Sequence, residues 1–93
     1  MKLEYFWADC ADGSHVAVNY TFWEGQVSGS IRRWSPDGRV NGGRRFEVPL
    51  GELARDERGA HLVLDGACEG ALRIPLDPSR LRLAEEELAG AAV

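Results

Sequence analysis

Long hydrophobic runs are missing from this chain, as are the short signatures of common nucleotide and calcium sites. No apolar segment approaches the roughly 20 residues that a membrane-spanning helix needs. The N-terminal segment carries Lys2, Glu4 and Asp9, without an apolar stretch and a small-residue cleavage site, so we expect no signal peptide. Phosphate-binding glycine loops and calcium-loop spacings are also absent from the sequence. These absences predict a cytoplasmic protein with no membrane contact.

Cysteine is scarce, because the chain contains only Cys10 and Cys68. Cytosolic cysteines are usually reduced, so we expect free thiols. Together with His15 and His61 they could supply a zinc site, but the spacings C-x4-H and H-x6-C match no usual zinc pattern. A thiol enzyme that uses Cys10 with His15 as its base is a further alternative, although the sequence indicates no pocket around the pair. We therefore expect no metal, no cofactor and no catalysis.

The balance of charge is uneven along the chain. Its 93 residues are 44% hydrophobic and 28% charged, which is typical of one folded domain spanning residues 1–93. The formal net charge is -4, yet residues 32–45 contain five arginines and one aspartate, a net +4. Nucleic-acid-binding domains are usually basic over a whole face. This single basic segment therefore favours an acidic patch on a protein as the partner over nucleic acid.

Alternating apolar and polar residues predict antiparallel strands in the first half of the chain. Asp12 and Gly13 are a strong signal for a two-residue hairpin turn. Pairing outward from that turn places Trp7 opposite Val18 and puts the large apolar residues on one face, as a sheet with one buried side requires. The predicted buried face consists of Leu3, Tyr5, Trp7, Val16, Val18, Tyr20 and Phe22.

A second turn, at Glu24 and Gly25, predicts a third strand in which Gly29 lies under Tyr20. The opposite face of these strands is expected to carry three large aromatic residues among small polar ones: Phe6, Trp23 and Trp34. Either a second layer covers these aromatics or they belong to a surface that binds a partner.

Turn signals divide the second half of the chain. Residues 35–43 predict a protruding loop or a short hairpin extension, and residues 44–50 predict a fourth strand. Asp65 and Gly66 predict another hairpin, with Val63 opposite Cys68. Residues 79–89 favour a helix with Asp77 as its N-cap, although their first residues also alternate as a strand would. The expected fold is α+β, an antiparallel meander of about five to six strands with a C-terminal helix packed on it, and the alternative is a small β-barrel or half-barrel.

The basic segment is the surface that we expect to make contacts, because arginine and tryptophan are enriched among interface hot spots. The predicted binding residues are Arg32, Trp34, Arg39, Arg44, Arg45 and Trp23. We expect a small non-catalytic protein that acts by binding another protein, as a regulator, an inhibitor or an immunity-type protein does. The alternative is a protein that binds an anionic ligand or nucleic acid through the same segment. A homodimer is a further alternative, in which the arginines of the predicted loop contact residues 85–87 of a second copy.

Overall fold

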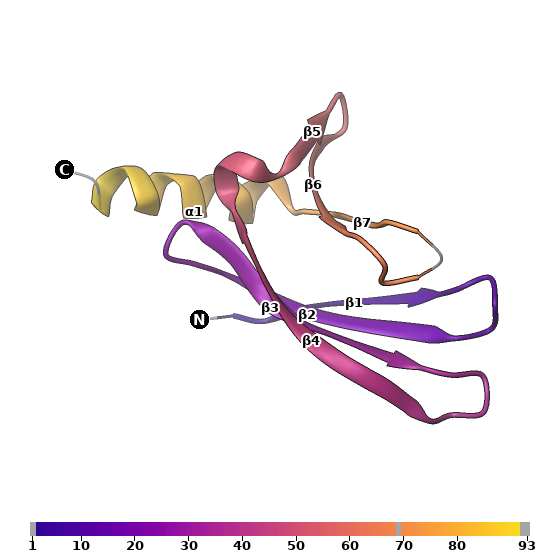
Figure 1. Cartoon of the computed structure of the whole chain (residues 1–93). Coiled ribbons are helices and arrows are strands. Elements are labelled where there is room, and N and C mark those ends of the chain that lie inside the picture. Colours follow the sequence, from indigo (N-terminus) through magenta and orange to yellow (C-terminus); the bar gives the residue numbers. More distant parts are fainter. Residues whose placement is uncertain (1, 69, 92–93) are drawn as a thin grey trace.

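The computed structural model describes residues 2–68 and 70–91, and Figure 1 shows them arranged in two layers. The lower layer in that view is an antiparallel sheet of four strands in the order β1-β2-β3-β4. The upper layer contains a three-stranded sheet in the order β5-β6-β7 and one helix. The strands of the lower sheet are β1 (Glu4–Asp9), β2 (His15–Trp23), β3 (Gln26–Trp34) and β4 (Val40–Pro49). Those of the upper sheet are β5 (Ala54–Asp56), β6 (Gly59–Leu64) and β7 (Leu72–Pro75), followed by the helix α1 (Pro78–Ala91).

The α+β class and the C-terminal helix are confirmed, but the expected single meander is wrong. The connection after β4 explains the division into two sheets. A short 3-10 helix, η1 (Leu50–Glu52), turns the chain from the lower layer into the upper one. Leu50 and Leu53 in this connection are both buried, so the connection contributes to the core. Neither sheet closes into a barrel within the described ranges.

The hydrophobic core lies between the two layers. Val16 and Val18 of β2 and Val27 of β3 face Leu62 and Ile74 of the upper sheet, and all five are at most 1% exposed. Burying a side chain of this kind contributes about 1.5–3 kcal/mol. None of the described helices has the length and apolar composition needed to cross a membrane.

Helix α1 begins at a capped turn, as the sequence predicts. The backbone N–H of Ser79 donates to Oδ1 of Asp77 at 2.8 Å, and Leu81 buries its side chain against the sheets. An ion pair between Arg80 and Glu4, at 2.6 Å, attaches the helix to β1. The helix therefore covers the same face of the lower sheet as β5-β6-β7 does (Figure 1).

The register of β1 differs by one residue from the predicted one. The structure pairs Trp7 with Ala17 and Phe6 with Val18. The cause is the turn. The Cys10 N–H donates to the Ser14 carbonyl at 2.8 Å, so these two residues pair and the loop between them has three residues. In that loop only the last residue, Gly13, has a positive φ, 88°, whereas the predicted two-residue turn needs two such residues.

The shift in register moves one set of side chains to the other face of the sheet. Phe6 packs against the core instead of lying on the opposite face. Leu3, Tyr5 and Trp7 lie outside the core, where they are 46%, 65% and 68% exposed. The predicted core role of these three residues is therefore wrong.

The β2-β3 hairpin has the predicted register throughout. Phe22 pairs with Val27, and Val18 with Ile31. Both turn residues, Glu24 and Gly25, have positive φ, as a tight two-residue turn requires.

The β6-β7 hairpin does not have the predicted register. Val63 pairs with Arg73 instead of Cys68. Cys68 belongs to a longer loop because it forms a disulfide bond with Cys10 of the lower sheet.

Gly29 provides a direct test of the β2-β3 register. A Cβ atom at this position would lie 1.8 Å from the backbone oxygen of Asn19, which is far closer than non-bonded atoms can approach. We expect Gly29→Ala to lower the free energy of unfolding by more than about 3 kcal/mol, because the two central strands would have to separate. Gly51→Ala is the matched control, since no heavy atom lies within 4 Å of its added Cβ. Equal stability of both variants in urea denaturation would contradict the pairing.

Candidate binding surface

The upper layer covers one face of the four-stranded sheet, and no described strand or helix covers the other (Figure 1). We call this uncovered side the open face. Alternation along the strands places on it the neighbours of the core residues. Its side chains include Leu3, Tyr5, Trp7, His15, Asn19, Ser30, Arg32, Trp34, Arg45 and Glu47.

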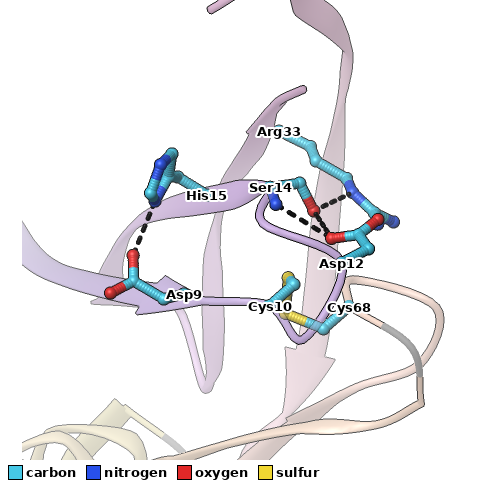
Figure 2. The surroundings of a disulfide bond; sticks show 7 residues. All are labelled: Asp9, Cys10, Asp12, Ser14, His15, Arg33 and Cys68. Atoms are coloured by element: carbon cyan, nitrogen blue, oxygen red, sulfur yellow. Dashed lines mark hydrogen bonds and ion pairs between the residues drawn. A yellow bond between two sulfur atoms is a disulfide. The ribbon is translucent and has the colours of Figure 1, made fainter. Parts of the chain in front are cut away.

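Two tryptophans form the hydrophobic centre of the open face. The rings of Trp7 and Trp34 stack with their centroids 6.0 Å apart and their planes at 17°. Ala17 lies between Trp7 and Arg32 in the register, so the small alanine separates an exposed indole from an exposed guanidinium. His15, which pairs with Trp34, lies beside the stack, and its Nδ1 is 2.6 Å from the Asp9 carboxylate (Figure 2).

The basic segment does not form one surface. Arg32 and Arg45 lie on the open face, and neither forms an ion pair with any described residue. Arg39 is on the exposed loop between β3 and β4, 3.4 Å from Asp37. The remaining two arginines point to the other side of the sheet and hold parts of the fold together.

Arg33 is the first of these two. Its guanidinium is 2.8 Å from the Asp12 carboxylate, and its Nε donates to Ser14 Oγ at 3.1 Å (Figure 2). Arg44 is the second, and it donates to the backbone carbonyl of Asp65 in the β6-β7 loop. Both arginines therefore stabilise the loops at one end of the sheet. Arg44, which the sequence predicts as a binding residue, lies on the side of the sheet opposite the open face.

Trp23 is not part of the arginine cluster, because it lies in the last position of β2, at the far end of the sheet from Trp34. It is 50% exposed and borders a cleft of about 420 Å³ between β2 and α1. Of the predicted binding residues, the structure brings together Arg32, Trp34 and Arg45, and leaves Trp23, Arg39 and Arg44 apart from them.

Trp7 and Tyr5 are the residues that sequence reasoning placed elsewhere. The signal that could have located them is the sequence of the β1-β2 loop. In a three-residue hairpin loop, glycine at the third position adopts the required positive φ, and Gly13 occupies that position. Counting outward from a three-residue loop gives the observed register and exposes both aromatics.

The disulfide bond corrects the prediction of free thiols. Cys10 and Cys68 are 58 residues apart in sequence, their Cα atoms lie 5.5 Å apart, and Figure 2 shows their bond joining the two layers. Neither sulfur is then available as a thiolate ligand or nucleophile. In the part of the chain that the structure describes, no cluster of three or more histidine, cysteine or acidic residues could hold a metal ion.

The loop next to the disulfide contains a carboxylate whose pKa is shifted. The hydroxyl and the backbone N–H of Ser14 both donate to Asp12 and hold the pKa of that carboxyl below its ordinary value of 3.8, and Arg33 lowers it further. The ionised form of Asp12 is therefore favoured in the folded loop. This interaction stabilises the same turn that determines the register of β1.

Comparison with known proteins found no matching family, no matching curated protein and no matching solved structure.

Because of the disulfide, we expect reduction of the Cys10–Cys68 bond to lower the stability of the fold. Opening the bond frees a large loop in the unfolded chain and releases Cys68 from the lower sheet. Losses of about 2–5 kcal/mol in the free energy of unfolding are usual. We expect dithiothreitol to lower the melting temperature of the wild type by at least ~8 °C. The Cys10→Ser, Cys68→Ser double variant should melt at the lower temperature with or without the reductant. A wild type that melts at one temperature in both conditions would refute the structural role of the bond.

Proposed function

We propose that this chain is a small non-catalytic protein that binds another protein on the open face. The observation that carries the proposal is the stacked pair of Trp7 and Trp34 beside the exposed Arg32. Trp7 remains 68% exposed in the monomer, so most of its apolar surface is available to a partner. Of the classes that the sequence suggests, a regulator, an inhibitor or an immunity-type protein acts in this way.

The exposed apolar side chains of the open face lie near one another. Leu3 just before β1 is followed on the same side by Tyr5 and Trp7 of β1, and Trp34 of β3 stacks on Trp7. Scattered exposed apolar side chains are ordinary on a soluble protein, whereas contiguous patches mark interaction sites. Stacked tryptophans next to an arginine also combine the residue types that dominate binding energy at protein interfaces.

The charge on this face supports an acidic patch as the counterpart. Arg32 and Arg45 lack carboxylate partners among the described residues, whereas the whole chain has a net charge of -4. A local positive patch can pair with carboxylates of a partner at short range. Long-range attraction to a polyanion would be weakened by the surrounding negative charge.

Single-stranded nucleic acid is the second candidate. Aromatic rings on a sheet face, with arginine beside them, can stack on bases and contact phosphates. The Trp7–Trp34 stack and Arg32 have this composition. We place this candidate second because the basic character extends over part of one face only.

A cytoplasmic location stays a prediction. The disulfide between Cys10 and Cys68 is a physical argument against it, because structural disulfides persist mainly in oxidising compartments.

A capture experiment with matched variants tests the proposed function. The baits in a lysate of the source organism are the wild type and the variants Trp7→Ala and Arg32→Glu. Leu83→Ala is the control for removing an exposed apolar side chain, and Arg58→Glu is the control for reversing an exposed charge. Leu83 is exposed on α1, in the cleft that Trp23 borders at the far end of the sheet from Trp34, and Arg58 is exposed in the β5-β6 turn. We expect one protein to be retained by the wild type and both controls and lost from both open-face variants.

Isothermal titration calorimetry with the identified protein then gives the size of the effect. Each open-face variant should bind at least tenfold more weakly, which is ~1.4 kcal/mol, while circular dichroism shows an unchanged fold. Affinities that stay within threefold of the wild type would overturn the proposal. Nuclease-sensitive nucleic acid that depends on Trp7 and Arg32 would instead favour the second candidate.

A further inference from the structure

Strand β4 forms a free edge of the four-stranded sheet. It spans Val40–Pro49, pairs with β3 on one side, and has no strand on its other side within the described chain. An edge strand presents a row of unpaired backbone N–H and C=O groups that can accept another strand. The strands at the other sheet edges, β1, β5 and β7, have six, three and four residues, so β4 with ten is the longest edge.

The direction of the backbone groups in β4 follows from one hydrogen bond. The N–H of Leu50 donates to the Gly25 carbonyl at 3.0 Å, so Leu50 points toward the β3 side. Backbone groups alternate from side to side along an antiparallel strand. Those of Gly43, Arg45 and Glu47 therefore point away from β3. Pro49, which has no N–H to donate, also falls on the outward side, where proline costs the β3-β4 ladder nothing.

We propose that a second copy of this chain adds its β4 to this edge, antiparallel and about a twofold axis at Phe46. Arg45 then lies opposite the partner's Glu47, and Glu47 opposite the partner's Arg45. Each of these two pairs can exchange two backbone hydrogen bonds in addition to the ion pair between the side chains. Gly43 lies opposite the partner's Pro49 and closes the ladder, since proline returns no hydrogen bond.

The charges of β4 select this register from its neighbours. A twofold axis perpendicular to the sheet pairs the central residue with its own copy. An axis at Arg44, Arg45 or Glu47 would therefore place a charged residue opposite itself, which destabilises a strand pair. An axis at Phe46 places the half-buried rings of two copies together and matches the charges on both sides of them.

This self-complementarity is why the occupant is a second copy and not an unrelated strand. A twofold interface requires that each surface patch fit itself, and the sequence Arg45-Phe46-Glu47 meets that requirement along one edge. The resulting sheet would run from β1 of one copy, through the two paired β4 strands, to β1 of the other copy. The two open faces would then lie side by side. The proposal shares Arg45 with the positive patch of the open face, but it does not use the tryptophan stack, so Trp7→Ala tests the protein-binding role without altering the dimer edge.

Charge reversal at the edge tests the proposal by sedimentation velocity over a range of concentrations. The wild type should show a monomer–dimer equilibrium. Arg45→Glu and Glu47→Arg should each weaken the dimer at least tenfold, because each variant puts like charges opposite one another. An equimolar mixture of the two variants should form a dimer again, because every pair in the mixed dimer then joins opposite charges.

Two control variants make the same charge changes elsewhere. Glu57→Arg and Arg58→Glu lie in the exposed β5-β6 turn and should leave the wild-type equilibrium unchanged. Circular dichroism checks that all variants are folded. A wild type that remains monomeric at about 1 mM, or variants that do not dimerise when mixed, would overturn the proposal. A dimer that survives both reversals but is lost in Glu86→Arg would overturn it in favour of the contact with residues 85–87.

Discussion

The three-residue loop between β1 and β2 determines which side chains the open face presents. Because Gly13 takes the positive φ at the third position, Cys10 pairs with Ser14 and β1 is fixed one residue away from the alternative register. Hydrogen bonds to Asp12 and its ion pair with Arg33 hold the loop in this form. A one-residue change in register exchanges the two faces of a strand. The exposure of Trp7 is therefore a consequence of the conformation of a loop several residues away.

The same loop connects the two layers. It places Cys10 on the inner side of the lower sheet, where its sulfur can reach Cys68. The bond holds Cys68 in the loop between β6 and β7, and in the same loop the Asp65 carbonyl accepts a hydrogen bond from Arg44. Two of the basic residues are thus used to hold loops in place, and the cationic surface is reduced to the arginines beside the tryptophan stack. The proposed partner surface follows from this division of roles.

Local rules were sufficient for the parts of the fold that depend on local contacts. The β2-β3 register follows from its two-residue turn and from Gly29, and the start of α1 follows from Asp77 and Pro78. The β1 register depends on whether the loop after β1 has two or three residues, and Gly13 fits either length. The β6-β7 register required knowledge of a disulfide between residues far apart in sequence, which spacing alone cannot supply. For that first reason the sequence places Arg32 and Trp34 of β3 on the face where the structure has them, but places Trp7 of β1 in the core.

The most direct test of this account is the register of β1, measured by nuclear Overhauser effects between backbone protons in solution. We expect cross-strand contacts from Trp7 to Ala17 and from Phe6 to Val18. Contacts from Trp7 to Val18 and from Tyr5 to Tyr20 would contradict it. They would place the Trp7 side chain among the core residues and remove the tryptophan stack from the open face.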